Sequence, residues 1–201
     1  MISEPMTLVT DYLLAAVTAA AGVLTLRAAH GEASRRAWAA AFMALALGAA
    51  LGGTHHGFRV ESLWLPTVMV IGVASAAMLA GSAIATTGGA LRRALLALAA
   101  LKLALFWAWV WRDDRFIWVV ADTGIAFALV ALLHALRWRW RQRGSGAILA
   151  GVALSVVAGL VQASGVDLHR HFNHNDLYHL IQLAGILAYY GGVRQLTDRN
   201  N

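Results

Sequence analysis

Cysteine is absent from this sequence of 201 residues, and charged residues are scarce. Without cysteine the chain can form no disulfide, no thiolate metal site and no cysteine nucleophile. Charged residues make up 13% of the sequence, whereas hydrophobic residues make up 60% and the mean hydropathy is +0.64. A soluble domain of this size needs a larger charged surface, so the composition is that of a membrane protein.

Apolar stretches recur along the whole sequence, and at about 20 residues each is long enough to cross a bilayer. Because unpaired backbone groups are costly in lipid and the stretches lack the spaced turn signals of a β-barrel, they favour helices. We predict an all-α fold, an integral membrane bundle of seven transmembrane helices, with residues 1–201 forming one domain. The expected helices are 6–28, 36–57, 63–88, 91–111, 115–137, 145–165 and 174–194.

The net charge of +6 is spread unevenly over the helix ends. Most arginines, from Arg27 to Arg199, fall at one set of ends, whereas the few at the opposite ends are matched by acidic residues. Because cytoplasmic ends are enriched in Lys and Arg, this predicts an outer N-terminus and a cytoplasmic C-terminus, in a bacterial-type inner membrane. The basic balance therefore needs no nucleic-acid partner. Glu4 and Asp11, with no basic residue before them, argue against a cleaved signal peptide, so we expect the first stretch to remain as a helix.

Two ionisable residues lie inside predicted spans, where such groups are costly and face a partner or a cavity. Lys102 lies about ten residues before the turn between the fourth and fifth helices and Asp122 about nine after it, so both lie roughly 15 Å below that turn. One expectation is an ion pair between them. The other places Asp122 in a central cavity.

Six of the eight histidines form two clusters that are distant in sequence. His55 and His56 end the second predicted helix, and the stretch 167–179, which leads into the seventh, contains His174, Asp176 and His179. Because the second helix runs outward and the seventh inward, both clusters are expected at the outer end of the bundle. Asp11, near the start of the first helix, lies at the same depth.

Imidazole is the commonest metal ligand among side chains, and residues three or four apart share one helix face. Asp176 and His179 can therefore converge, while His174 can join them only from a frayed first turn. The Gly48-Gly52-His56 spacing favours His56 over His55 as the inward-facing member of that pair. Zinc would take three such ligands and leave a fourth position for water. We predict a zinc site formed by His56 or His55 with His174 and His179, with Asp176 close to the metal.

A seven-helix bundle with a histidine ending helix two and histidines opening helix seven resembles the CREST superfamily of membrane hydrolases, which includes the alkaline ceramidases and the adiponectin and progestin receptors. The resemblance implies zinc held by one helix-two histidine, His56 or His55, and by two positions of helix seven. Asn175 stands where the family has the first of two helix-seven histidines, so His174 or Asp176 must replace it if a metal binds. Gly52 or Leu51 occupies the position of the family's serine, and the family's helix-three aspartate has no counterpart within the span.

We therefore expect a zinc-dependent hydrolase that cleaves an amide or ester bond of a lipid drawn from the bilayer. Zinc would lower the pKa of its bound water toward about 7 and polarise the carbonyl. Asp176 would orient or deprotonate that water, and Asp11 or Asp122 would supply further charge. Two alternatives remain: a non-catalytic protein whose histidines bind haem or copper, and a transporter or proton relay. The relay would use His179 and Asp176 with Gln182 and Gln162, which could line either a path or a pocket.

Overall fold

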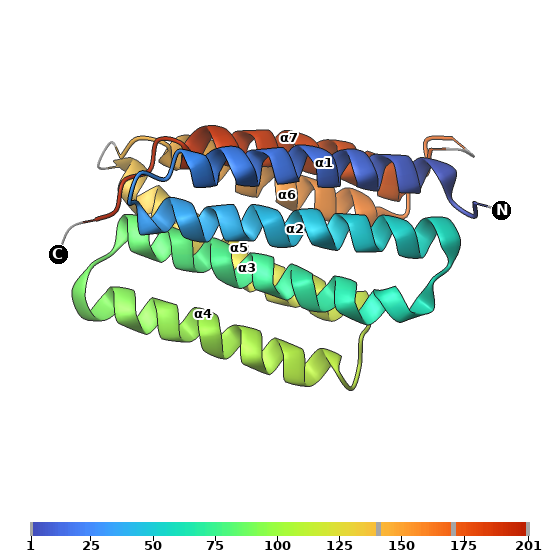
Figure 1. Cartoon of the computed structure of the whole chain (residues 1–201), viewed down its shortest axis with the longest axis horizontal. Helices are drawn as coiled ribbons and strands as arrows, with labels where there is room; N and C mark the ends of the chain where they lie inside the picture. The colour runs from blue at the N-terminus through green and yellow to red at the C-terminus, as the bar shows by residue number, and fades with distance from the viewer. Residues whose placement is uncertain (1, 140–141, 170–171, 200–201) are drawn as a thin grey trace.

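A computed structural model describes residues 2–139, 142–169 and 172–199 of the chain. The described chain forms seven α-helices, as predicted, and their bounds differ from the expected ranges by a few residues (Figure 1). In chain order they are α1 (Pro5–Arg27), α2 (Ala33–Phe58), α3 (Trp64–Thr86), α4 (Gly89–Val110), α5 (Phe116–Arg139), α6 (Ser145–Ser164) and α7 (His174–Val193), with the short 3-10 helix η1 (Glu61–Leu63) before α3.

Helix boundaries follow local sequence signals. Pro5 occupies the first position of α1, where its missing N–H costs little. At the start of α7, Asn173 and Asp176 form a capping box in which each side chain accepts a hydrogen bond from the backbone of the other. Gly165 ends α6 with a φ of 63°, a left-handed conformation that glycine adopts without strain. The seventh helix therefore starts at a defined point, which fixes the direction of its first side chains.

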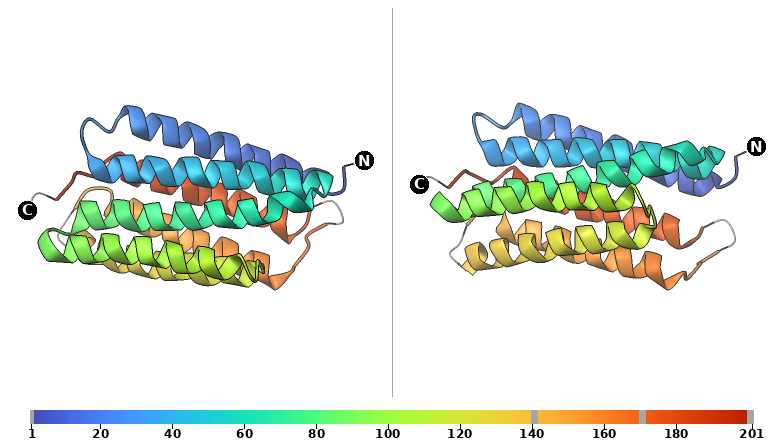
Figure 2. Two further views of the ribbon diagram at one scale, coloured as in Figure 1. Left: turned by 60° about the horizontal axis from the view of Figure 1, so that its bottom comes forward. Right: turned by 90° about the horizontal axis from the view of Figure 1, so that it is seen from below.

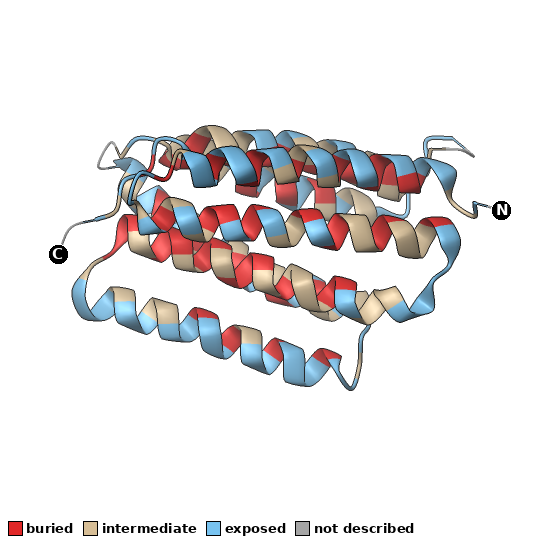
Figure 3. Cartoon of the chain, viewed as in Figure 1, coloured by how far each residue is buried: buried red, intermediate tan, exposed pale blue. Residues whose placement is uncertain are grey.

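Six of the helices form a closed ring and one lies outside it. Neighbours around the ring are α1, α2, α3, α5, α6 and α7, and α7 returns to pack against α1. Figure 2 shows α5 and α6 forming the edge of the bundle opposite α1 and α2. Helix α4 packs mainly against α3, and most of its surface is exposed in Figure 3. First and last helices are thus direct neighbours.

Six helices, α1 to α6, are long and apolar enough to cross a membrane, and the chain is a multi-pass membrane protein. Helix α7 does not meet the same criterion, because polar residues such as His174, Asp176, His179 and Gln182 occupy its first half. It nevertheless lies alongside α1 in Figure 1. The polar residues of α7 therefore face other helices or the end of the bundle.

The chain termini lie at opposite ends of the bundle (Figure 1). We call the end with Pro5 and His174 the histidine end, and the end with Arg27 and Val193 the arginine end. After α7 the chain crosses the arginine end, where Leu196 is fully buried. Asp198 accepts hydrogen bonds from the backbone N–H groups of Ala33 and Ser34, at 2.7 and 2.9 Å. The C-terminal segment thereby closes the arginine end over the start of α2.

Candidate functional site

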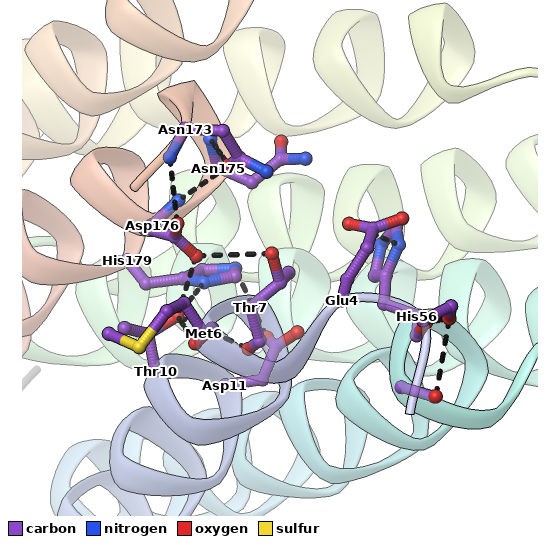
Figure 4. A network of polar contacts seen from close by, with 12 residues as sticks. Glu4, Met6, Thr7, Thr10, Asp11, His56, Asn173, Asn175, Asp176 and His179 are labelled. Carbon is purple, nitrogen blue, oxygen red and sulfur yellow. Dashed lines mark hydrogen bonds and ion pairs between the residues drawn. The ribbon is translucent and has the colours of Figure 1, made fainter. Parts of the chain in front are cut away.

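A buried polar cluster lies between the first turns of α1 and α7 at the histidine end (Figure 4). Thr7, Thr10 and Asp11 come from α1, and Asp176 and His179 come from α7. Residues three or four positions apart share a helix face, so each helix directs its members toward the other. All five are less than a tenth exposed. The cluster joins two segments that are more than 150 residues apart in sequence.

His179 is held through both nitrogens of its imidazole ring. Thr10 Oγ1 lies 2.9 Å from Nδ1, and Asp11 Oδ1 lies 3.1 Å from Nε2. His179 is 8% exposed and Asp11 is 4% exposed. An imidazole placed between a hydroxyl and a carboxylate is oriented for proton transfer, because the carboxylate stabilises the ring when it becomes protonated.

Asp176 is fixed through both of its carboxylate oxygens. Thr7 donates to Oδ1 at 3.1 Å and the Thr10 hydroxyl lies 3.5 Å from the same atom, whereas the backbone N–H of Asn173 donates to Oδ2 at 2.8 Å. Asp176 therefore has two roles, because it caps α7 and also contacts the hydroxyls that surround His179.

The second oxygen of Asp11 is the one atom of the cluster without a partner. Oδ2 is buried and receives no hydrogen bond from any described residue. Helix α2 approaches Asp11 closely at Gly53, where an added Cβ would lie 2.7 Å from the Asp11 Cβ. A buried carboxylate oxygen without a donor is costly, so Asp11 Oδ2 is the natural point for a proton or another ligand to bind.

His56 and Glu4 lie beside the cluster, nearer the histidine end (Figure 4). His56 Nδ1 lies 3.8 Å from Glu4 Oε2, and both side chains are partly exposed. His55 turns elsewhere, because its ring packs against Trp64 at a centroid distance of 5.3 Å. A cavity of about 160 Å³ beside Glu4 is lined by Thr7 and Asp176, among others. This cavity leads from the surface toward the cluster.

His174 does not join the cluster. Its Nδ1 atom lies 2.8 Å from Asp167 Oδ1 in the connection before α7, and the hydrogen bonds from His174 hold the pKa of Asp167 below its ordinary value. Within residues 2–139, 142–169 and 172–199, no three histidine or acidic side chains converge as a metal site. Both ring nitrogens of His179 and both carboxylate oxygens of Asp176 already contact protein groups, so a zinc ion would have to displace these contacts, and the predicted zinc stays a prediction.

Asp122 lies away from the cluster and forms the expected ion pair. Lys102 Nζ lies 2.6 Å from Asp122 Oδ1, and the Ser75 hydroxyl donates to Asp122 Oδ2 at 2.6 Å. Lys102 also donates to Ser75 at 2.8 Å. The carboxylate is therefore neutralised where α3, α4 and α5 meet and does not contact His179 in the described contacts.

Sequence reasoning did not identify Thr7 and Thr10, although both lie on the Asp11 face of α1. The available signal was their spacing, since 7, 10 and 11 fall on one side of a helix. It also did not single out His134, which is fully buried near the arginine end and lies within 3.2 Å of the hydroxyls of Ser82 and Ser145. Two hydroxyl partners on α3 and α6 indicate that His134 joins helices.

The chain belongs to a family of unknown function, DUF6962, whose model matches residues 6–198. The match covers all seven helices and both histidine clusters, so the polar cluster lies within the family's own domain. Comparison with curated proteins and comparison with solved structures each gave no match.

Proposed function

We propose that the protein is a membrane-embedded hydrolase that cleaves an amide or ester bond of a lipid. The observation that carries the proposal is the position of His179, whose imidazole lies between the hydroxyl of Thr10 and the carboxylate of Asp11. General acid–base catalysis needs a base whose partners fix both its orientation and its proton. The resemblance to the CREST membrane hydrolases supports the same reaction class.

His179 is the group that takes and returns a proton. In the neutral ring one nitrogen carries a hydrogen and the other accepts one. Attack of water on a carbonyl carbon releases a proton to the imidazole, and the ring then gives a proton to the leaving alcohol or amine. Asp11 positions the ring and stabilises its protonated form. Asp176 lines the cavity that leads from the histidine end, where it can contact the polar head of a substrate.

The location of the cluster supports a lipid substrate. His179 lies about a turn and a half inside α7, at a depth that a lipid head reaches without leaving the bilayer. We further propose that all seven helices cross a bacterial-type inner membrane with the N-terminus outside. The arginine distribution supports this orientation. The cluster would then face the outer leaflet.

Hydrolysis can be tested on the purified protein in lipid nanodiscs with fluorescent ceramide, phosphatidylcholine and lysophospholipid as probes. Release of the labelled acyl chain is expected for at least one probe. His179→Ala and Asp11→Asn should lower the rate by at least about a hundredfold, the lower end of the contribution of general acid–base catalysis. His169→Ala, which removes an exposed histidine in the connection before α7, serves as the matched control and should retain activity. Cleavage that persists in His179→Ala would overturn the assignment.

Elemental analysis tests the zinc that the sequence predicts. The expected content is about one zinc per chain at neutral pH, lost in His179→Ala and falling below about pH 6, since imidazole ligands must be neutral. His174→Ala should show whether His174 is a zinc ligand or stays paired with Asp167. If His174 remains paired with Asp167, zinc is retained, and if it swings into the site, zinc is lost. Activity in protein that contains no metal would show that zinc is not required, and His179 would remain the proposed acid–base group.

The continuous chain of hydrogen bonds favours a second candidate function, a proton relay. Asp176, Thr10, His179 and Asp11 are linked in that order. A relay predicts proton flux into liposomes that is lost in Asp11→Asn, without cleavage of any lipid. Cleavage without flux selects the hydrolase, and flux without cleavage selects the relay.

A further inference from the structure

A second and larger cavity also borders α7. It has a volume of about 340 Å³ and is lined by residues of α2, α3, α5, α6 and α7. On α7 its wall runs from Tyr178 to Tyr189, a length of about 16 Å at about 1.5 Å per residue. This volume is near the lower end of the range of about 300–1,000 Å³ found for small-molecule sites.

The exposed part of the wall belongs to α5 and α6. Val120 is 48% exposed and Leu160 is 66% exposed, whereas Trp38 and Tyr189 on the opposite wall are buried. Gly124 of α5 and Gly159 of α6 also line the cavity, and a Cβ added at either would meet no atom within 4 Å. The cavity therefore opens sideways between α5 and α6.

Aromatic rings make up much of the inner lining. They come from three helices: Trp38, Phe42, Phe116, Phe127, Tyr178 and Tyr189. Trp38 and Tyr189 lie with their ring centroids 5.4 Å apart, and Trp38 and Phe42 lie 6.0 Å apart. A cavity lined by aromatic side chains favours a ligand with a planar ring, because offset or edge-to-face contacts between the rings add to simple apolar burial.

Polar groups in the wall that have an atom without a hydrogen-bond partner in the described chain include Trp38 Nε1 and the Gln182 side chain, and Gln182 supplies the acceptor. Gln182 uses its amide nitrogen to donate to Ser155 Oγ at 3.1 Å, and Ser155 lies 3.3 Å from the Tyr189 hydroxyl. Among the described contacts, the Gln182 carbonyl oxygen accepts no hydrogen bond, while the residue lines the cavity. A ligand with a hydroxyl group can donate to this oxygen, which fixes the polar end of the ligand inside the cavity.

We propose that this cavity binds a membrane lipid that carries a hydroxyl on a planar ring, with the ring among the aromatic side chains and the hydroxyl on Gln182. The ligand enters from the bilayer between α5 and α6, past Gly124 and Gly159. This site is distinct from the His179 cluster, although Tyr178 and His179 are adjacent in α7. Binding here goes beyond the proposed hydrolysis and does not depend on it.

Three probes of equal carbon number test the ring and the hydroxyl separately: para-decylphenol, decylbenzene and hexadecanol. Decylbenzene has the ring and chain of para-decylphenol without its hydroxyl, and hexadecanol has a hydroxyl without a ring. The wild-type protein in phosphatidylcholine nanodiscs should bind para-decylphenol most tightly, as measured by isothermal titration and by the rise in Tm. Loss of one hydrogen bond should weaken decylbenzene by roughly tenfold. If hexadecanol binds as tightly as para-decylphenol, the proposed preference for a planar ring is wrong. If decylbenzene binds as tightly as para-decylphenol, the proposed hydroxyl contact with Gln182 is wrong.

Substitutions test the place of binding. Gly159→Leu has room for its side chain and should weaken para-decylphenol binding at least tenfold by covering the opening. Gly191→Leu is the matched control, because it also has open space but lies outside the cavity wall, and it should bind normally. Gln182→Leu should bring para-decylphenol to the affinity of decylbenzene. His179→Ala should bind normally, so failure of hydrolysis and failure of this proposal are distinguishable. Unchanged binding in both Gly159→Leu and Gln182→Leu would place the probe elsewhere and overturn the site.

Discussion

At the scale of single residues, Asp198 shows how a carboxylate far along the chain secures the start of a helix. Its two oxygens accept hydrogen bonds from the N–H groups of Ala33 and Ser34, which are the first residues of α2. Glu32, the residue before the helix, provides no side-chain cap. Burial raises the pKa of Asp198, but the hydrogen bonds from Ser34 and Ala33 outweigh it and leave the pKa below its ordinary value.

Asp198→Asn should therefore lower the free energy of unfolding by about 1 kcal/mol at neutral pH, the typical value of a lost helix cap. Because the pKa is depressed on folding, this contribution is complete above the ordinary value of about 3.9 and disappears as the pH falls through the folded pKa. The difference in Tm between wild type and Asp198→Asn should be constant above about pH 5 and shrink below about pH 4. Asp114→Asn, at an exposed position, is the control. A difference that grows in acid would contradict the sign.

At the scale of helices, α4 is attached to the bundle by few buried side chains. In the described chain these are Ala99, Lys102, Phe106 and Val110. Phe106 lies where Gly72 of α3 has no side chain, since an added Cβ there would lie 2.5 Å from the Phe106 ring. Lys102 reaches Asp122 of α5 and Ser75 of α3. Position and register of α4 therefore depend on a small set of contacts, among them the Phe106 packing and the Lys102–Asp122 ion pair.

A double-mutant cycle tests the ion pair. Lys102→Met or Asp122→Asn alone leaves a buried charge without its partner, which costs about 3–5 kcal/mol when burial is complete. The double variant should be more stable than the less stable single variant, because it removes both charges. Thermal unfolding in detergent measures all four proteins. Additive losses would show that the two residues act independently.

At the scale of the whole molecule, the distribution of arginine predicts a single orientation. A reporter active only in the periplasm should function when fused at the N-terminus or within residues 166–173, and should be inactive when fused at the C-terminus. A cytoplasmic reporter at the same three positions is the control and should give the reverse pattern. An active periplasmic reporter at the C-terminus would reverse the orientation and place the cluster toward the cytoplasm.

The helices and the depth of the polar residues follow from the amino-acid sequence alone. Length and hydropathy decide how many residues cross a bilayer, and alternating direction decides which helix ends meet. For this reason the order of residues is enough to place His56, His179 and Asp11 at one end of the bundle. The ion pair of Lys102 with Asp122 was predictable on the same ground, because two residues equally distant from one turn lie at the same depth.

Which side chains at that depth contact one another depends on how the helices pack. Hydropathy is nearly uniform around these helices, so it does not fix their rotation or the order in which they close the ring. The packing of α1 against α7 gave His179 the partners Thr10 and Asp11, whereas the capping of α7 turned His174 toward Asp167. The larger cavity also depends on how the helices pack. Five helices contribute to its wall, so only the tertiary structure shows that Tyr189 and Gly159 line the same cavity.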